Sequence, residues 1–459
     1  MTIIDLRKRT TMKIKSLHIA DFNQFQNFSL DLTYPEGHER AGEPLDKVCI
    51  IGQSGTGKTS LLRFMQRMTK IEQELVDNEY VWTIKDISNL KYGNKSFISI
   101  NVYDHVANKL AFIWHWTVDE RSNNSIHNAV DTKSNYHEQD PSNIFVQNYQ
   151  KSLIIPAELV QRYSEFEEKV DKDLTPPQFL DLGKIHLGKF WKSYQKQISD
   201  YQKKLIQKRN EFGKLVANKS VTAKQLSIEA DSLREFEEQL ENPLTIIGNG
   251  FLNKLLENFK LRVKTDVDLD DIGFLKIEDF QGREVPNAFL STGTKQILLT
   301  ALPIYASKLK NALIFFDEPE RSLYPDIQTK IVDFYTSLAP DSQFFFATHS
   351  PLVASSFDPW EIVELKFKED GAVYQELYYE GERHVDNYNV FPKRLDYSGI
   401  LSKVFDVEEE SNAERIKALM ELSLLERKIK ETPLQSEKKI LWKQYEKLAN
   451  SLNWETADA

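Results

Sequence analysis

Apolar and polar positions alternate along the first part of the chain in the pattern of half-buried β-strands. Residues 13–19 and 28–32 carry this pattern, and residues 96–103 and 110–118 repeat it further on. An unbroken apolar run at residues 48–51 instead predicts a strand that is buried on both faces. The pattern therefore predicts an antiparallel lobe together with one buried central strand.

The middle of the chain changes to the period of amphipathic helices. Apolar residues recur at mostly three- and four-residue spacing over residues 189–219, and again from Leu226 until Pro243 stops the run. A turn is expected near residues 218–220. The two helices would then lie antiparallel, as in a short coiled-coil hairpin.

The charges on these two helical arms differ in sign. Residues 184–224 hold eleven Lys and Arg against two Asp and Glu, whereas residues 225–242 hold six acids against one Arg. Oppositely charged arms attract each other, which would make the basic run part of the hairpin. Alternatively, the basic arm contacts nucleic acid or a partner protein.

Buried strands return in the second half of the chain. Residues 312–316 and 343–347 are continuous apolar runs, as expected of parallel strands covered on both faces. Residues 151–156 read as a further strand, and the polar stretch at residues 120–143 reads as an exposed loop. Residues 413–448 are highly charged and predict helices.

Composition limits the class of protein. The 459 residues are 41% hydrophobic and 28% charged, which is ordinary for a globular chain. The net charge of −10 and the pI near 5.6 disfavour non-specific coating of nucleic acid. Cys49 is the single cysteine, which excludes an internal disulfide and a Cys-rich zinc site and suits a reducing cytoplasm. No apolar stretch reaches membrane-spanning length, and the N-terminus lacks the apolar core of a secretory signal.

A Gly-rich segment directly after residues 48–51 fits the P-loop pattern G-x-x-x-x-G-K-[ST]. Glycines let backbone N–H groups curl around phosphates, and the helix that follows directs its positive end at the anion. Lys58 is expected to reach the β- and γ-phosphates, and the Thr59 hydroxyl to bind Mg²⁺. The predicted cradle consists of Gly52, Gln53, Ser54, Gly55, Thr56, Gly57, Lys58, Thr59 and Ser60.

Two carboxylates, Asp317 and Glu318, end the apolar run at residues 312–316. Two adjacent acids at the end of a buried strand are costly without a cation nearby. The arrangement matches a Walker B motif, in which Asp317 would help to hold Mg²⁺ and Glu318 would polarise the attacking water.

Two shorter motifs flank the Walker B residues. Ser291 and Gly293 open a predicted helix at residues 296–309 and offer a hydroxyl and backbone N–H groups to a phosphate, although Ser291 fits a simple N-cap equally well. His349 follows the apolar run at residues 343–347. An isolated histidine is more often structural than catalytic, so its place in the order of motifs matters.

Taken in order, the four motifs resemble the ABC-type ATPases of the RecF, SMC and OLD branch, over residues 13–65 and 285–365. The resemblance implies an α/β P-loop NTPase, namely an ABC ATPase head with an antiparallel β lobe, a short coiled-coil hairpin insertion and a helical C-terminus. Residues 290–296 are similar to a variant ABC signature loop. Tyr324 replaces the His of the Leu-His-Pro segment of OLD-type and Septu-type ATPases.

The same resemblance implies ATP and Mg²⁺ as cofactors and a homo-oligomer, at least a dimer, formed through the ATP sites. Three residues would take part in catalysis, namely Glu318, Lys58 and the switch histidine His349. Two further residues, Ser291 and Gly293, would act across the interface on the opposing copy. A Q-loop glutamine is also expected, and Gln24, Gln147 and Gln150 compete for that position.

Four regions are expected along the chain. They are an N-terminal ATPase lobe at residues 1–160, a helical insertion at 161–245, a C-terminal ATPase lobe at 246–370 and a mostly helical region at 371–459 for partner binding or oligomerisation. Glu408, Glu409 and Glu410 read as a solvated helix start rather than a metal site, so no nuclease domain is expected there.

Two functions compete at this point. The chain resembles stand-alone ATPase subunits of antiphage systems of the Septu, PARIS or retron-linked type, which implies nucleotide-driven dimerisation that senses a trigger and regulates a separate nuclease or toxin. The alternative is a RecF-like DNA-repair ATPase that clamps duplex DNA. The basic arm at residues 184–224 favours the alternative, and the net acidity disfavours it.

Overall fold

The computed structural model describes the chain in two compact units, Met1–Arg394 and Leu395–Ala459. The described segments are residues 10–68, 71–76, 79–84, 96–104, 109–118, 126–131, 152–157, 159, 179–182, 188–218, 220–265, 275–307, 309, 311–407, 413–452 and 454. Gln147, Gln150 and Glu408–Glu410 lie outside these segments.

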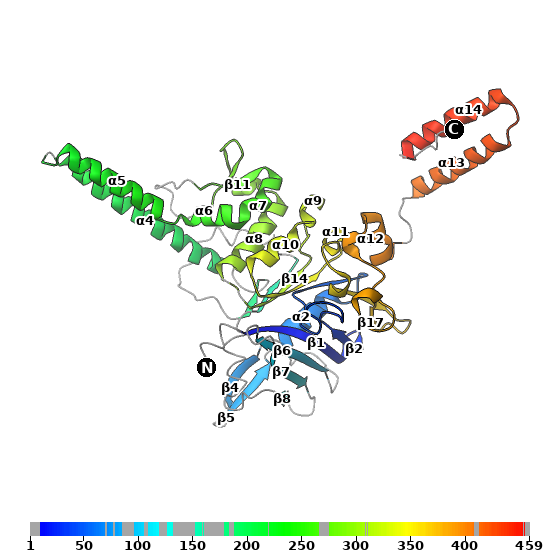
Figure 1. The fold of residues 1–459 in the computed structure, drawn as a ribbon, viewed down its shortest axis with the longest axis horizontal. Coiled ribbons are helices and arrows are strands. Elements are labelled where there is room, and N and C mark those ends of the chain that lie inside the picture. The colour runs from blue at the N-terminus through cyan, green and yellow to red at the C-terminus, as the bar shows by residue number, and fades with distance from the viewer. Residues whose placement is uncertain are drawn as a thin grey trace. The chain divides into compact units, whose positions relative to one another are not determined.

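A seven-stranded sheet forms the centre of the first unit (Figure 1). All its neighbouring strands run parallel except for an antiparallel edge pair, β16 and β17. Its strands in spatial order are β10 (Phe179–Asp181), β9 (Ser152–Ile155), β14 (Leu313–Asp317), β15 (Gln343–Ala347), β3 (Lys47–Gly52), β16 (Ile362–Phe367) and β17 (Val373–Glu376).

The central strands carry unbroken apolar runs because helices and a second sheet cover both of their faces. Strand β15 is buried along its whole length, and β14 is buried up to Asp317. Phe315 and Phe345 stack across the two strands, with ring centroids 5.0 Å apart. The strands predicted at residues 48–51, 151–156, 312–316 and 343–347 are therefore confirmed.

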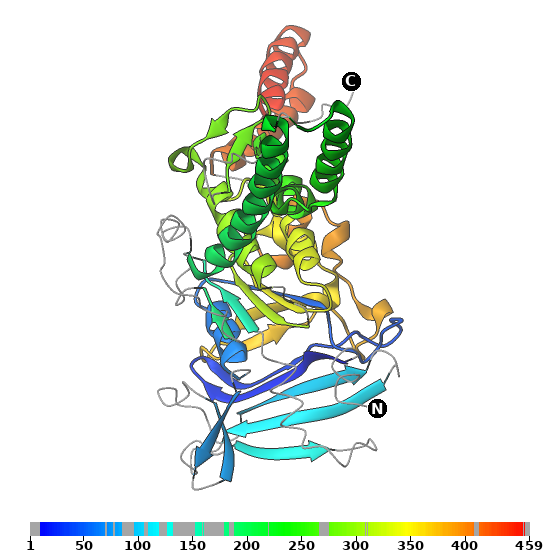
Figure 2. The same cartoon turned by 90° about the vertical axis from the view of Figure 1, so that its left-hand side faces the viewer.

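An antiparallel sheet forms a second layer (Figure 2). Its strands in spatial order are β2 (Phe25–Asp31), β1 (Thr10–Phe22), β6 (Ser96–Asp104), β7 (Lys109–Val118) and β8 (Ile126–Asp131). Beside it lies a hairpin of β4 (Ile71–Val76) and β5 (Glu79–Ile84). The prediction of an exposed loop throughout residues 120–143 was wrong at β8, which is held by backbone pairing to β7 and needs no apolar alternation.

Helices pack around the central sheet. The one that follows the Gly-rich loop, α2 (Lys58–Met68), shares a single core with β1, β2 and the central strands, through Leu61, Phe64 and Met65. The predicted helix at residues 296–309 is α8, which begins earlier, at Thr292, and contains Pro303. The remaining helices of the central region are α9 (Pro325–Gln328), α10 (Ile331–Leu338), α11 (Pro351–Ala354) and the 3-10 turn η6 (Pro359–Glu361).

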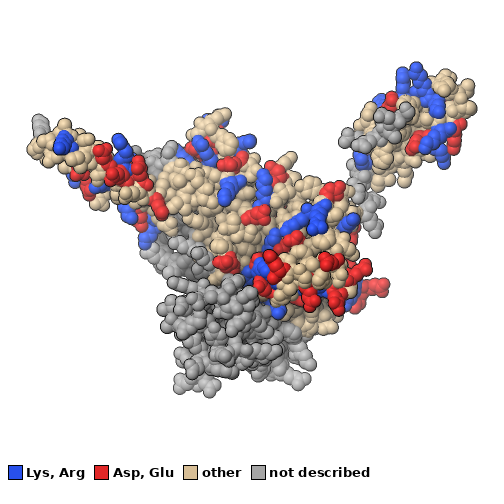
Figure 3. Space-filling view, viewed as in Figure 1, with Lys and Arg blue, Asp and Glu red and all other residues tan. Residues whose placement is uncertain are grey.

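The predicted pair of helices in the middle of the chain is present as α4 (Gly188–Ala217) and α5 (Ala223–Gln239). Thr222 and Gln225 form a capping box at the start of α5. Arg209 of α4 pairs with Glu237 of α5 at 2.7 Å, and Figure 3 shows acidic and basic side chains interleaved along the pair. That the pair forms a coiled coil remains a prediction.

Short elements lead from this pair to α8. They are α6 (Pro243–Ile247), η3 (Gly248–Leu252), α7 (Asn253–Leu256), η4 (Glu257–Phe259), the small sheet of β11 (Leu261–Val263), β12 (Ile277–Asp279) and β13 (Glu284–Val285), and η5 (Asn287–Phe289). Beyond β17, the 3-10 turns η7 (Val385–Asn387) and η8 (Pro392–Arg394) close the first unit. This unit therefore extends past residue 370, where the sequence analysis placed a boundary.

The second unit is helical, as predicted for residues 413–448. It contains α12 (Tyr397–Val404), α13 (Ala413–Glu431) and α14 (Gln435–Leu452). Helices α13 and α14 share a core of their own, made of Leu422, Leu425, Ile429, Tyr445, Ala449 and Leu452. None of the helices in the described segments is long and apolar enough to cross a membrane.

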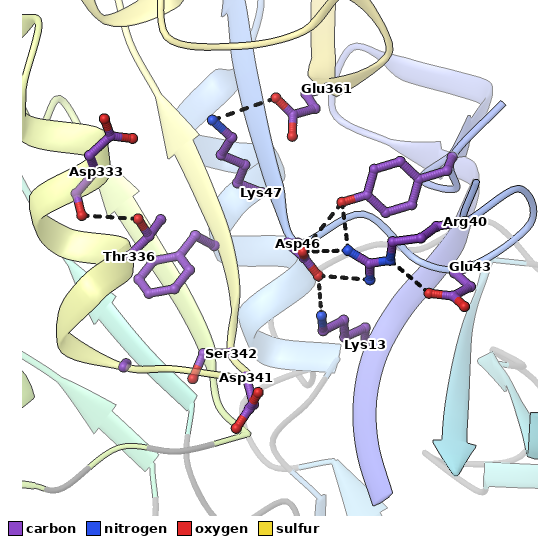
Figure 4. Close-up of a pocket in the computed structure, with 13 residues that line it drawn as sticks. Lys13, Arg40, Glu43, Asp46, Lys47, Asp333, Thr336, Asp341, Ser342 and Glu361 are labelled. Atoms are coloured by element: carbon purple, nitrogen blue, oxygen red, sulfur yellow. Dashed lines mark hydrogen bonds and ion pairs between the residues drawn. The ribbon is translucent and has the colours of Figure 1, made fainter. Parts of the chain in front are cut away.

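A charged pocket lies at the amino ends of β3 and β15, at the opposite end of β3 from the Gly-rich loop (Figure 4). Asp46 is its centre and pairs with both Lys13 and Arg40. Burial by itself would raise the pKa of Asp46, but hydrogen bonds from Arg40 and the charge of Lys13 outweigh it and lower this pKa to about 2. The charges of this ion network satisfy one another, so its role is structural.

Replacing Asp46 with Asn is expected to lower the free energy of unfolding at pH 7 by roughly 2 kcal/mol, because buried Lys13 loses its counter-charge. The lowered pKa of Asp46 means that its stabilisation is complete above pH 4 or so and fades as the pH falls towards 2. Urea unfolding should therefore separate the variant from the wild type fully at pH 7 and by roughly half as much at pH 3. Asp341→Asn, at an exposed position in the same pocket, is the control and should match the wild type at both values.

Candidate functional site

The Gly-rich loop turns between the end of β3 and the start of α2. Gln53, Ser54 and Gly55 form its exposed apex, whereas the Thr56 hydroxyl folds back and donates to the carbonyl oxygen of Gln53 at 2.8 Å. Gly57 has a φ of +88°, and a Cβ at this position would lie 2.0 Å from Nε2 of Gln24. A side chain at this position is therefore excluded by both backbone conformation and contact.

Of the three glutamines considered for the Q-loop, Gln24 is the one in the described part of the chain. It lies in the turn between β1 and β2, and its Nε2 donates to the carbonyl oxygen of Gly55 at 3.1 Å. The backbone of Val373 in β17 donates to the Gln24 carbonyl at 2.9 Å and holds this turn in place. Gln24 thus supports the loop that the sequence predicted as the phosphate cradle.

Lys58 begins α2 and is buried, with 7% of its surface exposed. Its Nζ donates to the carbonyl oxygens of Gly52 at 2.8 Å and Gln53 at 3.1 Å. Burial lowers the pKa of Lys58 to about 8, although the nearby carboxylates of Asp317 and Glu318 act in the opposite direction. The ammonium group is thus desolvated and bonded to neutral oxygens, which favours an arriving anion.

Thr59 and Asp317 lie side by side although 258 positions separate them in the sequence. The Thr59 hydroxyl is 2.9 Å from each carboxylate oxygen of Asp317. Burial raises the pKa of Asp317, and the charge of Glu318 adds to the rise. The Thr59 hydroxyl and the Asp317 carboxylate lie next to each other, and both offer oxygen atoms as ligands. Mg²⁺ prefers oxygen ligands of this kind.

Glu318 directly follows β14 and adopts a left-handed backbone, with a φ of +52°. Its N–H donates to the carbonyl oxygen of Ala347 in β15 at 2.8 Å, which holds this conformation. A non-glycine residue in this region costs on the order of 1 kcal/mol or more, and such residues are enriched at functional sites. The strain directs the Glu318 side chain away from the regular course of the strand.

His349 follows β15 on the neighbouring strand end and is exposed. Burial lowers its pKa, and the charge of Lys58 lowers it further, while Glu318 acts in the opposite direction. The imidazole is therefore largely neutral at pH 7 and lies within electrostatic reach of the predicted P-loop lysine.

Glu320, to which the sequence alone assigned no role, connects the segments that follow β14 and β15. Its Oε1 accepts from the Thr348 hydroxyl at 2.7 Å and from the backbone N–H of His349 at 3.0 Å. Nothing in the local pattern identifies it, although it directly follows the Asp317-Glu318-Pro319 run.

Ser291 is the N-cap of α8. Its hydroxyl accepts from the Thr294 N–H at 3.1 Å, and Ser291 itself is exposed. A Cβ on Gly293 would lie 2.6 Å from the carbonyl oxygen of Ser322. The start of α8 therefore packs closely against the loop that follows β14, and only glycine permits this approach.

The residues present fit a nucleotide with Mg²⁺. The loop of residues 52–60 offers backbone N–H groups, Lys58 offers a cation, and Thr59 with Asp317 offers oxygen ligands. The described residues contain no group of three or more His, Cys, Asp or Glu that could hold a metal ion. Mg²⁺ at nucleotide sites commonly takes one or two protein ligands and completes its shell with phosphate and water.

No curated protein matches the chain at a significant level. Among solved structures it is similar to an Smc head domain with an extended coiled coil bound to the C-terminal domain of ScpA, derived from Pyrococcus furiosus. The identity is 12%, the match covers 80% of this chain and 96% of that one, and the TM-score is 0.40. An SMC head domain from Thermotoga maritima matches at 10% identity over 80% of this chain and 98% of that chain, with a TM-score of 0.39.

The sequence profile of one protein family matches over a long part of the chain. That family is the AAA ATPase domain, and the match spans residues 12–354. The matched region begins in β1, contains the loop around Lys58 and the strand end at Asp317, and closes in α11 after His349. Because the match covers well over half of the sequence, this chain belongs to the AAA ATPase domain family.

Proposed function

We propose that this chain binds Mg²⁺-ATP at residues 52–60 and hydrolyses it at a site completed by a second copy of the chain. The observation that carries the proposal is the contact of the Thr59 hydroxyl with both oxygens of Asp317. This contact joins the phosphate-binding loop to the acidic strand end that carries Glu318.

Each residue has a role in this proposal. Lys58 binds the β- and γ-phosphates, and Thr59 and Asp317 hold Mg²⁺, which when bound neutralises phosphate charge. Glu318 accepts a proton from the attacking water, and neutral His349 orients the γ-phosphate. The two carboxylates have different surroundings: Asp317 bonds to Thr59, whereas Glu318 follows it on a left-handed backbone.

A second copy is proposed as the partner because the start of α8 is exposed and its polar groups are not used by the P-loop. Ser291 caps its own helix, and in the described residues its hydroxyl bonds only within that helix. Two aromatic side chains flank this surface: Phe289 is 80% exposed and Tyr324 is 72% exposed. Large exposed aromatics are typical of interface residues. ATP would favour the closed dimer by contacting both copies, and hydrolysis would release it.

Mixing two inactive variants tests the shared site. Lys58→Met disables the phosphate cradle, and Ser291→Glu places a negative charge where the opposing copy would bind ATP. Each variant alone is expected to lack ATPase activity. In a symmetric dimer, an equal mixture restores one intact site in each mixed dimer and should regain about one quarter of the wild-type rate.

The matched control is a chain that carries both Lys58→Met and Ser291→Glu. A dimer of this chain has no intact site and should stay inactive. If the two single variants stay inactive when mixed, while each still forms oligomers, the ATP site is contained in one copy and the shared site is excluded. Phe289→Ala should in addition weaken ATP-dependent association measured by light scattering.

For the biological role, we propose an antiphage regulator that holds a separate effector protein, a nuclease or a toxin, in the cytoplasm. Support comes from the second unit, which has its own core and still exposes large apolar side chains, Met420, Leu424 and Ile440, suited to protein contact. The resemblance of the motifs to stand-alone ATPase subunits of defence systems points the same way.

The alternative is a clamp on duplex DNA, which the exposed lysines of α4 favour: Lys196, Lys203, Lys204 and Lys214. Light scattering on the Glu318→Gln protein distinguishes the two functions. The measurement is made in the presence of ATP, with and without duplex DNA. A complex with a co-expressed effector, indifferent to DNA, supports the regulator. A dimer that needs both ATP and DNA, and weakens steeply with salt, supports the clamp.

A further inference from the structure

Glu320 connects two segments that both belong to the candidate site. It lies in the loop between β14 and α9, and its Oε1 accepts two hydrogen bonds from the turn after β15. One donor is the Thr348 hydroxyl, at 2.7 Å, and the other is the backbone N–H of His349, at 3.0 Å. A single carboxylate oxygen therefore sets the backbone of the histidine that the proposed function places at the γ-phosphate.

Further hydrogen bonds extend this connection. The Thr348 hydroxyl accepts from the Ser350 N–H at 2.9 Å, and the Ser350 hydroxyl donates to Oε1 of Gln328 at 2.5 Å. Gln328 donates in turn to the carbonyl oxygen of Leu323 at 2.8 Å. The turn of residues 348–350 is thus held at both ends by the segment of residues 320–328.

The same segment touches the start of α8. Ser322, two residues after Glu320, has a φ of +63°, and its carbonyl oxygen is the atom that a Cβ on Gly293 would meet at 2.6 Å. A continuous set of contacts therefore runs from the start of α8, through residues 320–328, to His349. Packed contacts of this kind transmit displacement because protein interiors are close-packed.

The other oxygen of Glu320 distinguishes this residue from an ordinary structural acid. Oε2 is shielded from solvent and has no hydrogen-bond partner among the described residues. A buried carboxylate oxygen without a donor is costly, and burial raises the pKa of Glu320 despite the two bonds to Oε1. In the Asp46 network, by contrast, both carboxylate oxygens are paired.

We propose that Glu320 is a positioning residue that fixes the direction of His349 at the nucleotide site and links it to the contact between Ser322 and Gly293. Its two bonds to the 348–349 turn leave the imidazole little freedom to rotate away with its backbone. The role in catalysis rests on the proposed function, whereas the orientation of His349 does not.

Two pairs of variants test the proposal. Thr348→Ser keeps the hydroxyl and Thr348→Val removes it at nearly equal volume. Glu320→Gln keeps an acceptor oxygen for both bonds and replaces the unpaired Oε2 with a neutral amide, whereas Glu320→Leu removes both bonds. Losing hydrogen bonds to a charged group is expected to lower kcat at least about tenfold in Thr348→Val and Glu320→Leu. Affinity for ATP should change less than about threefold, because the hydrogen bonds of both side chains join them to each other and to the turn of residues 348–350 rather than to the phosphate cradle.

A second measurement does not depend on hydrolysis. In protein labelled with ¹³C-histidine, the His349 ring signal is assigned by its loss in His349→Gln, and its chemical shift and pH titration are followed. Thr348→Val and Glu320→Leu should move that signal and its titration midpoint. Thr348→Ser and Glu320→Gln should leave both close to the wild type.

The outcomes separate the two ideas. If the wild type hydrolyses no ATP but the His349 signal moves as described, positioning holds and the proposed ATPase cycle fails. If the signal stays unchanged in Thr348→Val and Glu320→Leu, Glu320 does not position His349. If Glu320→Gln is as impaired as Glu320→Leu, the charge of Glu320 matters rather than its bonds, and the proposal is overturned.

Discussion

Lys58→Met is expected to weaken ATP binding on the order of 100-fold or more, as measured by equilibrium titration with a fluorescent ATP analogue. The Lys58 ammonium is buried, and its bonds go to the neutral carbonyl oxygens of Gly52 and Gln53. A triphosphate would bring negative charge into direct contact with this group, which the nearby carboxylates of Asp317 and Glu318 reach only at longer range. Methionine keeps the length and burial of the side chain but has no charge to offer.

The same substitution should leave the fold intact. Among the described residues Lys58 forms no ion pair with a carboxylate. Removing a desolvated charge of this kind is neutral or stabilising, so the urea midpoint without nucleotide should not fall. Lys47→Met is the matched control, because Lys47 starts the same strand, β3, at its opposite end. An unchanged ATP affinity in Lys58→Met, or an equal loss in Lys47→Met, would show that ATP does not bind at residues 52–60.

Glu318→Gln is expected to lower the rate of ATP hydrolysis about 100- to 10,000-fold while ATP still binds, because the amide cannot accept the proton of the attacking water. The ATP-bound dimer should accumulate in this variant and be visible by light scattering. Asp317→Asn is the informative comparison. This variant should lose the Mg²⁺-dependent binding of ATP, because Asp317 and the Thr59 hydroxyl in contact with it are the proposed Mg²⁺ ligands.

The left-handed backbone of Glu318 offers a second readout. Glu318→Gly should abolish hydrolysis as well, yet raise thermal stability by about 1 kcal/mol, because glycine adopts a φ of +52° without strain. If Glu318→Gln hydrolyses ATP at the wild-type rate, another group is the base. If Glu318→Gly is less stable than the wild type, Glu318 contributes to the fold through contacts rather than storing strain.

Much of the core could be predicted from local pattern. A strand covered on both faces is apolar at nearly every position. The apolar runs at residues 48–51, 312–316 and 343–347 therefore predict central parallel strands. A cradle for phosphate is likewise built from consecutive residues, and the run from Gly52 to Ser60 can be recognised without knowledge of any distant contact.

Other elements follow rules that the local pattern does not contain. Strand β8 is stabilised by backbone pairing with β7, so its polar sequence predicted a loop. Strand β17 lies at the edge of the central sheet, and its residues lack the unbroken apolar run of the central strands. Ser291 was left open between an N-cap and a phosphate contact, and its hydroxyl caps α8 in the structure.

By itself, then, the sequence determined the strands that are buried on both faces, the phosphate cradle and the order of the motifs, because each depends on neighbouring residues. Only the tertiary structure decided that Thr59 contacts Asp317, that Gln24 supports the cradle, and that Glu320 holds the backbone of His349. These contacts arise because the sheet order β14-β15-β3 brings the ends of strands far apart in sequence to one edge. Backbone pairing and core packing across the whole domain set that order, and it cannot be predicted from the local periodicity of the sequence.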